Sequence, residues 1–298
     1  MSTKAKIVRL ILLAVVLVSP GRAGAGSRRA NEKTYDESVQ RQIVPLKIYR
    51  DFLLVAKGQF GTALEDQNFI IDTGTAPSII NASLVARLGL ATVPSPSRAM
   101  GKTIPGQALT FPEIELGPIC AVSLHVQVQD LSRIERDLGI PIAAIIGLDV
   151  LSKSSFRLDY DKREMEFGNV SHTGIPVHFD PRTGIAVAEV RVEGKETRFL
   201  LDTGTDRVVL FGGNFPDAGW LNLQNTSQTG ANQVSQEVDL QVFSAAEIMI
   251  GGQHFSDERA YFVPGSTDSL FDGLLGVRAL GFRGLSYDQA RETFYLQK

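Results

Sequence analysis

The chain has 298 residues, of which 43% are hydrophobic and 21% are charged, and its formal net charge is −3. This composition supplies enough apolar material for a sizeable core and excludes an intrinsically disordered chain, and the length predicts two domains or one large one. The weak negative charge gives no electrostatic basis for binding nucleic acid or an anionic membrane surface, so neither is expected as a partner.

The N-terminus has the pattern of an export signal, predicted to cover residues 1–25. Basic residues precede an apolar run from Leu10 to Val18, and small residues follow at Ala23-Gly24-Ala25. The run is short for a transmembrane helix, which needs about 20 apolar residues. We therefore expect an exported protein, periplasmic or secreted, without stable membrane insertion after cleavage; an uncleaved membrane anchor is the alternative. The polar residues 26–43 are interpreted as a linker or a short pro-segment.

Beyond the linker, short apolar runs broken by Gly, Pro, Asn and Asp indicate a mostly β protein. Alternation of apolar and polar residues predicts half-buried strands at 124–128 and 186–192. Two short helices are predicted, at Ser83–Leu88 after Asn81 and at Ser132–Leu138.

Cysteine and histidine give no sign of a reactive or metal site. Cys120 is the only cysteine, so no intramolecular disulfide can form, and its apolar neighbours predict a small buried side chain. The histidines lack metal-ligand spacing, and neither a nucleophile elbow nor a phosphate loop is present. We therefore expect no metal and no cofactor.

The chain contains an internal repeat with an offset of about 130 residues. Four elements recur in the same order: Phe69–Thr75 with Phe199–Thr205, Pro112–Gly117 with Ala246–Gly251, Ile145–Leu151 with Leu274–Leu280, and Leu158–Asp161 with Leu285–Asp288. This series predicts two homologous lobes, residues 44–172 and 173–298, with Gly168–Gly174 as the connector.

The best-matched element is Asp-Thr-Gly-Thr after three apolar residues, with Asp72 in one copy and Asp202 in the other. In each copy the glycine permits a tight turn that leaves backbone N–H groups near the carboxylate. The threonine after it can donate a hydrogen bond to that carboxylate, and the threonine before it can bind across a lobe interface. These supporting residues are Thr73, Gly74 and Thr75 in the first copy and Thr203, Gly204 and Thr205 in the second.

Two lobes packed about a pseudo-twofold axis would bring Asp72 and Asp202 together. Two close carboxylates do not both ionise easily, so the pair holds one proton over a range of pH. One carboxylate then acts as a base toward a water while the other polarises a carbonyl, which suits hydrolysis of an amide.

These paired motifs resemble those of the pepsin–retropepsin superfamily of aspartic peptidases, over about residues 45–298. The resemblance implies the acid-protease fold: mostly β, two β-barrel-like lobes related by a pseudo-twofold axis, and an active-site cleft between them. It places Gly147 and Gly276, in Ile145-Ile146-Gly147 and Leu274-Leu275-Gly276, under the catalytic loops. It also implies an aspartic endopeptidase with a peptide or protein substrate, of the compact single-chain bacterial type. Because both aspartates lie in one chain, a monomer is expected.

Two other interpretations stay open. A protein of the same two-lobe fold could bind a peptide or an envelope component without catalysis, since a fold alone does not establish an activity. A structural β-sandwich with coincidental motifs would leave the ordered repeat unexplained.

Candidate flaps over the cleft lie between the catalytic motif and the repeated Glu-Ile element of each lobe, at 99–107 and 226–234. Thr103 to Gly106 is the expected tip of one flap, and Thr229-Gly230 with the next two residues that of the other. An ordinary hairpin loop is the alternative in both cases.

The lobes diverge next to the shared motifs. Asp206-Arg207 follows the second motif and predicts a local ion pair at the rim; the alternative places Asp206 near the dyad, where it would raise the pKa values of both aspartates. Asp149 lies two residues after Gly147, but Arg278 takes that position in the second lobe, so a catalytic role in both lobes is not expected.

Overall fold

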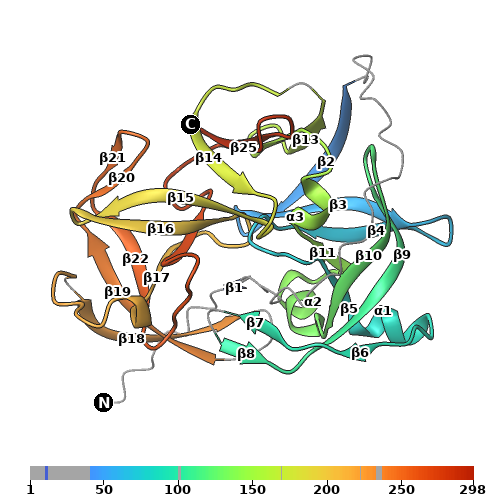
Figure 1. The fold of residues 1–298 in the computed structure, drawn as a ribbon, viewed down its shortest axis with the longest axis horizontal. Helices are drawn as coiled ribbons and strands as arrows, with labels where there is room; N and C mark the ends of the chain where they lie inside the picture. The colour runs from blue at the N-terminus through green and yellow to red at the C-terminus, as the bar shows by residue number, and fades with distance from the viewer. Residues whose placement is uncertain (1–10, 13–40, 100–101, 169, 222, 233–236) are drawn as a thin grey trace.

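A computed structural model describes residues 11–12, 41–99, 102–168, 170–221, 223–232 and 237–298. The chain is mostly β, as predicted, with two lobes side by side and a further sheet that joins them (Figure 1). The predicted signal peptide and linker lie outside the described residues, except for Ile11–Leu12 (β1), which pairs with the end of β18, and residues 41–43. Within the described ranges, no helix is long and apolar enough to cross a membrane.

Six strands of the first lobe close into a barrel. In order around it they are β3 (Leu53–Phe60), β4 (Leu64–Ile71), β11 (Ala144–Ile146), β5 (Ile79–Asn81), β10 (Ile119–Gln129) and β9 (Gln107–Leu116), which pairs again with β3. The apolar run before Asp72 ends β4 inside this barrel, where Phe69, Ile70 and Ile71 are fully buried. The barrel interior therefore fixes where the first aspartate emerges.

The helices of the first lobe are short. Asn81 caps α1 (Ala82–Arg87) by accepting a hydrogen bond from the Ser83 N–H at 3.1 Å. The second helix is α2 (Ser132–Leu138), and α3 (Leu148–Leu151) follows Gly147. The helix predicted after Asn81 is confirmed to within one residue, and the helix from Ser132 is confirmed with its predicted bounds.

The second lobe repeats the barrel order with one strand interrupted. Its strands are β15 (Ile185–Val192), β16 (Lys195–Asp202), β23 (Gly273–Gly276), β17 (Val208–Phe211), β22 (Glu258–Val263), β19 (Glu237–Ala245), β20 (Ile248–Ile250) and β21 (Gln253–Phe255), with β18 (Leu223–Asn232) beside β19. Together β19 and β20 take the place of β9, because β19 pairs with β22 and β20 with β15. Glu193 accepts the N–H groups of Ala246 and Glu247 at the break.

A six-stranded antiparallel sheet joins the lobes. Its order is β2 (Gln42–Tyr49), β13 (Glu164–Phe167), β12 (Phe156–Asp159), β24 (Gly284–Asp288), β25 (Thr293–Gln297) and β14 (Ile175–Asp180). At its centre Leu158 is paired with Leu285, the residue to which the sequence repeat aligns it. A pseudo-twofold axis thus passes between these two leucines.

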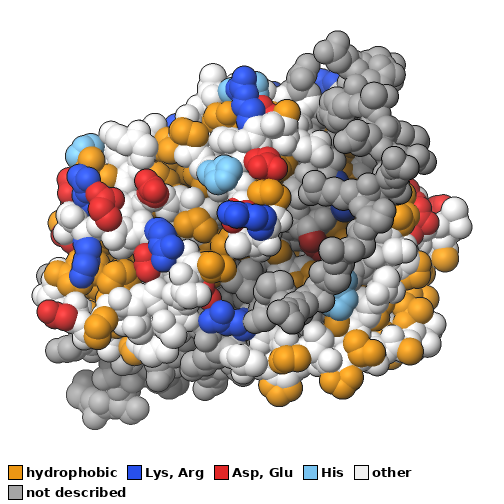
Figure 2. Space-filling view, viewed as in Figure 1, with side chains coloured by type: hydrophobic (Ala, Val, Ile, Leu, Met, Phe, Trp, Pro, Cys, Tyr) orange, Lys and Arg blue, Asp and Glu red, His pale blue; other side chains and the backbone are white. Residues whose placement is uncertain are grey.

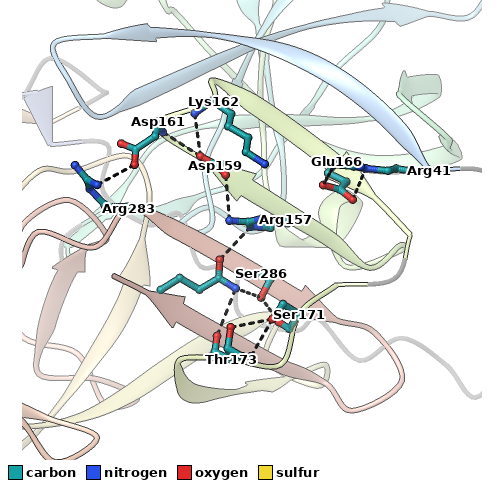
Figure 3. A network of polar contacts seen from close by, with 11 residues as sticks. Arg41, Arg157, Asp159, Asp161, Lys162, Glu166, Ser171, Thr173, Arg283 and Ser286 are labelled. Carbon is teal, nitrogen blue, oxygen red and sulfur yellow. Dashed lines mark hydrogen bonds and ion pairs between the residues drawn. The ribbon is translucent and has the colours of Figure 1, made fainter.

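The face of this sheet away from the core carries a polar network (Figure 3). Arg157 lies 3.0 Å from Asp159 and donates to Gln297 Oε1 at 3.1 Å. The ion pair Arg283–Asp161, at 3.3 Å, also joins the two halves. The Arg157–Gln297 and Arg283–Asp161 contacts therefore link the two lobes at this sheet.

Burial follows the strand alternation, and one prediction is wrong. Cys120 is exposed and its thiol lies 3.2 Å from Glu113 Oε1, because Ile119 and Ala121 take the inward positions of β10 and leave Cys120 and Val122 outside.

On the face drawn in Figure 2, basic and acidic side chains are interspersed, in keeping with the small net charge.

Candidate active site

Each Asp-Thr-Gly-Thr motif begins at the end of a barrel strand. The neighbouring strand there belongs to the repeated element that contains Gly147 or Gly276. Asp72 directly follows β4, and its N–H donates to the Ile146 carbonyl of β11 at 3.0 Å. Asp202 is the last residue of β16 and is paired with Gly276 of β23. Both aspartates are fully buried. The buried barrel strands thus deliver each carboxyl group to the junction of the lobes.

Thr73 and Thr203 tie the two motifs together. The Thr73 hydroxyl donates to the Leu201 carbonyl at 2.9 Å and accepts the Thr203 N–H at 3.1 Å. The Thr203 hydroxyl makes the symmetric pair of bonds, to the Ile71 carbonyl at 2.9 Å and from the Thr73 N–H at 3.0 Å. These four bonds cross the lobe interface, as the sequence predicted for this threonine position.

The motifs are close enough for the carboxyl groups to interact. A Cβ built on Gly74 would lie 2.6 Å from Asp202 Cγ, so a side chain at this position would overlap the partner carboxyl group. Each glycine N–H donates to the aspartate of its own motif, Gly74 to Asp72 at 2.8 Å and Gly204 to Asp202 at 2.6 Å. Gly74 is therefore required for the close approach of the loops, and in both motifs the backbone N–H of this position binds the carboxyl group.

Burial raises the pKa of both carboxyl groups, and proximity to Asp72 raises that of Asp202 further. For Asp72 the largest cause is desolvation, which outweighs the hydrogen bonds from Thr75 and Gly74 and gives a pKa of about 6. For Asp202, desolvation and the charge of Asp72 raise the pKa well above its usual value. Above about pH 6 and below the higher pKa of Asp202, the pair therefore holds one proton.

The threonines after the glycines differ between the lobes. Thr75 Oγ1 donates to Asp72 Oδ2 at 2.7 Å. Thr205 Oγ1 instead accepts the Arg207 N–H at 3.3 Å, and Asp202 Oδ2 is buried without a hydrogen-bond partner among the described residues. The threonine hydroxyl bond predicted for both carboxylates is thus present for Asp72 only.

The glycines of the second repeated element lie against the catalytic loops. A side chain on Gly147 would overlap the Thr75 carbonyl, and one on Gly276 would overlap the Thr205 carbonyl. Leu148 N–H donates to the Thr75 carbonyl at 3.0 Å. Both glycines therefore occupy the positions that the sequence assigned to them.

The half-buried Asp149 and the buried Ser78 form a pair that sequence reasoning missed. The Asp149 carboxylate accepts the Ser78 hydroxyl at 2.6 Å and the Ser78 N–H at 3.0 Å, and the same hydroxyl accepts the Gly147 N–H at 2.9 Å. Burial raises the pKa of Asp149, although the bonds from Ser78 oppose the rise. Asp149 was not expected to be functional because the second lobe has no aspartate at the equivalent position. The sequence signal for this pair is that Asp149 and Ser78 each lie a few residues beyond a repeated motif.

The predicted flap segment of the first lobe forms a hairpin of β7 (Ser97–Ala99) and β8 (Lys102–Ile104), after the short strand β6 (Val93–Pro94). Thr103 is paired with Arg98 within this hairpin, and Gly106 lies beyond it, so neither is at a tip. Arg98 Nη2 lies 3.4 Å from Asp268 Oδ2 of the loop between β22 and β23. This ion pair joins the first-lobe hairpin to the second lobe, and sequence reasoning did not find it.

The corresponding segment of the second lobe forms the β18–β19 hairpin. Thr229 and Gly230 lie within β18, paired with Asp239 and Val238, rather than at a tip. Nearer the catalytic loop, Arg207 Nη1 lies 2.9 Å from Asp206 Oδ2, which is the predicted local ion pair. Burial raises the pKa of Asp206, and Asp206 is not among the groups that shift the dyad.

The four histidines stand apart from this site. His172 lies 2.7 Å from Asp288 and His254 3.3 Å from Glu247, while His125 and His178 are exposed on strands. In the described part of the chain, no group of three or more His, Cys, Asp or Glu side chains is arranged to hold a metal ion.

Comparison with known families gives two matches to one family model, described as aspartyl protease. They cover residues 60–150 and 188–279, together more than half of the chain, with one match in each lobe. Each match contains an Asp-Thr-Gly-Thr motif and the glycine element beneath it. A comparison with curated proteins gave no match. The chain belongs to the aspartyl protease family, within the pepsin–retropepsin superfamily.

Proposed function

We propose that the chain is an aspartic endopeptidase in which Asp72 and Asp202 hydrolyse a peptide bond by activating a water. The observation that carries this proposal is the pair of fully buried carboxyl groups, one from each lobe, that interact closely and have raised pKa values. Such a pair supplies a base and an acid at once, which is what uncatalysed amide hydrolysis lacks.

In the proposed reaction, ionised Asp72 takes a proton from the water while the water oxygen bonds to the peptide carbonyl carbon. Protonated Asp202 gives its proton to the carbonyl oxygen, and the product of this step is a neutral gem-diol. When the C–N bond breaks, the leaving nitrogen takes the proton from Asp72. One hydroxyl of the gem-diol returns its proton to Asp202, so the starting protonation state is restored.

The substrate is proposed to bind in extended form between the lobes. Strand β4 leads to Asp72 and strand β16 ends at Asp202, and extended peptides pair with strand edges through main-chain hydrogen bonds. Because each lobe supplies one aspartate, a single chain is proposed as the active unit. The export pattern at the N-terminus supports a proposed periplasmic or secreted location.

The test is cleavage of a peptide mixture, followed by mass spectrometry, from about pH 3 to about pH 8. Asp72→Asn and Asp202→Asn should each reduce the rate about 10³-fold or more, because neither variant retains both an acid and a base. Asp161→Asn is the matched control, since Asp161 is exposed in the turn between β12 and β13. Activity that survives in either dyad variant would refute the proposal. Inactive wild-type protein that still binds a statine-type transition-state mimic would favour the non-catalytic alternative.

A further inference from the structure

The two catalytic loops are held by different contacts. In the first lobe, Ser78 joins Asp149 to the Gly147 N–H, and Leu148 N–H holds the Thr75 carbonyl. The pairing of β5 with β11 and of β17 with β23 makes Val208 the counterpart of Ser78 and Arg278 that of Asp149. Neither residue can rebuild the contact, because valine has no hydroxyl and arginine no acceptor.

The second loop is held by a backbone bond instead. The Gly276 N–H donates to the Arg207 carbonyl at 2.9 Å, whereas the Gly147 N–H donates to the Ser78 hydroxyl. The Arg278 side chain instead donates to the Phe282 carbonyl at 2.9 Å, and its guanidinium lies over the Tyr160 ring. The difference at the glycine element coincides with the difference at the threonines, where only Thr75 donates to its aspartate.

We propose that Asp149 is a positioning residue that, through Ser78 and Gly147, holds Thr75 where its hydroxyl donates to Asp72, so that Asp72 is the ionised base and Asp202 carries the proton. We call the contacts among Asp149, Ser78 and Gly147 the first-lobe brace. It acts through three contacts: Asp149 accepts from the Ser78 hydroxyl, this hydroxyl accepts the Gly147 N–H, and Gly147 lies directly against the Thr75 carbonyl. This inference rests on the proposed peptidase function.

The brace explains an asymmetry that the motifs alone do not contain. A hydroxyl that donates to a carboxylate stabilises the ionised form, so Thr75 favours ionisation of Asp72. Among the described residues, Asp202 accepts a hydrogen bond only from the Gly204 N–H, at Oδ1, and its buried Oδ2 is left for the proton shared with Asp72. In the described ranges, the titratable groups that interact with Asp72 are Asp202 and Tyr160, and burial together with the charges of both aspartates raises the pKa of the Tyr160 hydroxyl.

The test is the pH profile of kcat/KM for Asp149→Asn. Loosening the brace weakens the Thr75 bond, so the acidic limb, which reports ionisation of the base, should move to higher pH by about one unit. Simple removal of a nearby negative charge would move the limb to lower pH, so the direction separates the two effects. Arg278→Lys changes the counterpart position in the second lobe, keeps the charge, and should leave the limb in place.

A double-mutant cycle identifies the route. Thr75→Val should produce the same upward shift, and the double variant Asp149→Asn with Thr75→Val should shift no further than Thr75→Val alone. Ser78→Ala, which breaks the brace without changing the carboxylate, replaces Asp149→Asn if that variant does not fold. A limb that coincides with wild type in folded Asp149→Asn, or additive shifts in the cycle, would overturn the inference. Failure of the proposed function is distinct, since wild-type protein would then show no activity at any pH.

Discussion

The first and second catalytic loops share four residues and differ in what surrounds them. Thr73 and Thr203 make the same interlobe bonds, so the contacts that join the loops are symmetric. Thr75 and Thr205 do not make the same bonds, and only the first lobe has the Asp149–Ser78 pair. The comparison shows that symmetric contacts hold the loops together while asymmetric contacts distinguish the two carboxyl groups.

The largest expected effect tests the symmetric contacts. Thr73→Val removes a hydroxyl that satisfies two buried backbone groups, so the free energy of unfolding should fall by about 4 kcal/mol. Thr203→Val should cost the same within error, because its bonds are equivalent. Urea denaturation measures both values. Two clearly unequal losses would contradict the symmetry of this contact, and Thr183→Val, at a surface turn, is the control.

The pH dependence of stability tests the dyad as a buried pair. The folded state holds protons that the unfolded carboxyls have released, so stability should be greatest below about pH 4 and fall as the pH rises toward the folded pKa of Asp72, about 6. The rise in the Asp72 pKa corresponds to a loss of roughly 3 kcal/mol. Thermal or urea unfolding of wild type and of the Asp72→Asn, Asp202→Asn double variant measures the slope. The double variant should lack this decline, and parallel curves would contradict the prediction.

A smaller effect should separate Thr75 from Thr205. Thr75→Val removes the donor to Asp72 and should lower kcat/KM about tenfold on the acidic side of the profile, since more of the base is protonated there. Thr205→Val should have a much smaller effect, because Thr205 does not donate to Asp202. Initial rates at several pH values measure both. Equal losses would show that the hydroxyls act alike and that the loops are symmetric in function.

The sequence was informative where the two halves agree and uninformative where they differ. Asp72 and Asp202 could be paired because the repeat makes them equivalent, and their threonine and glycine neighbours followed from the same motif. The Asp149–Ser78 contact could not be predicted, because it joins residues 71 positions apart and has no copy to reveal it. The burial of Cys120 was mispredicted because an apolar neighbourhood does not tell which face of a strand a residue takes. The predicted flap tips lie in or next to paired strands rather than at the hairpin turns, because residue types typical of turns also occur beside turns.

The smallest expected effect concerns the ion pair between Arg98 and Asp268. It joins the first-lobe hairpin to the second lobe, and its arginine is 32% exposed while its aspartate is 3% exposed. If the hairpin must move for a substrate to reach the dyad, this contact has to break first. Partly exposed ion pairs contribute about 0.2–1 kcal/mol, so Arg98→Gln should raise kcat/KM for a long peptide by no more than about fivefold.

Salt dependence gives that last prediction its control. Screening weakens a partly buried ion pair less than an exposed one, so kcat/KM of wild type should rise slightly with ionic strength toward the Arg98→Gln value, and the variant itself should respond less. Lys57→Gln breaks an exposed ion pair within the first lobe, between Lys57 and Asp66, and should leave both the rate and its salt dependence as in wild type. Asp268 is unsuitable for the same experiment, because its carboxylate also accepts the Leu270 N–H and shapes its own loop. An Arg98→Gln protein with the salt response of wild type would show that the two lobes open without breaking this contact.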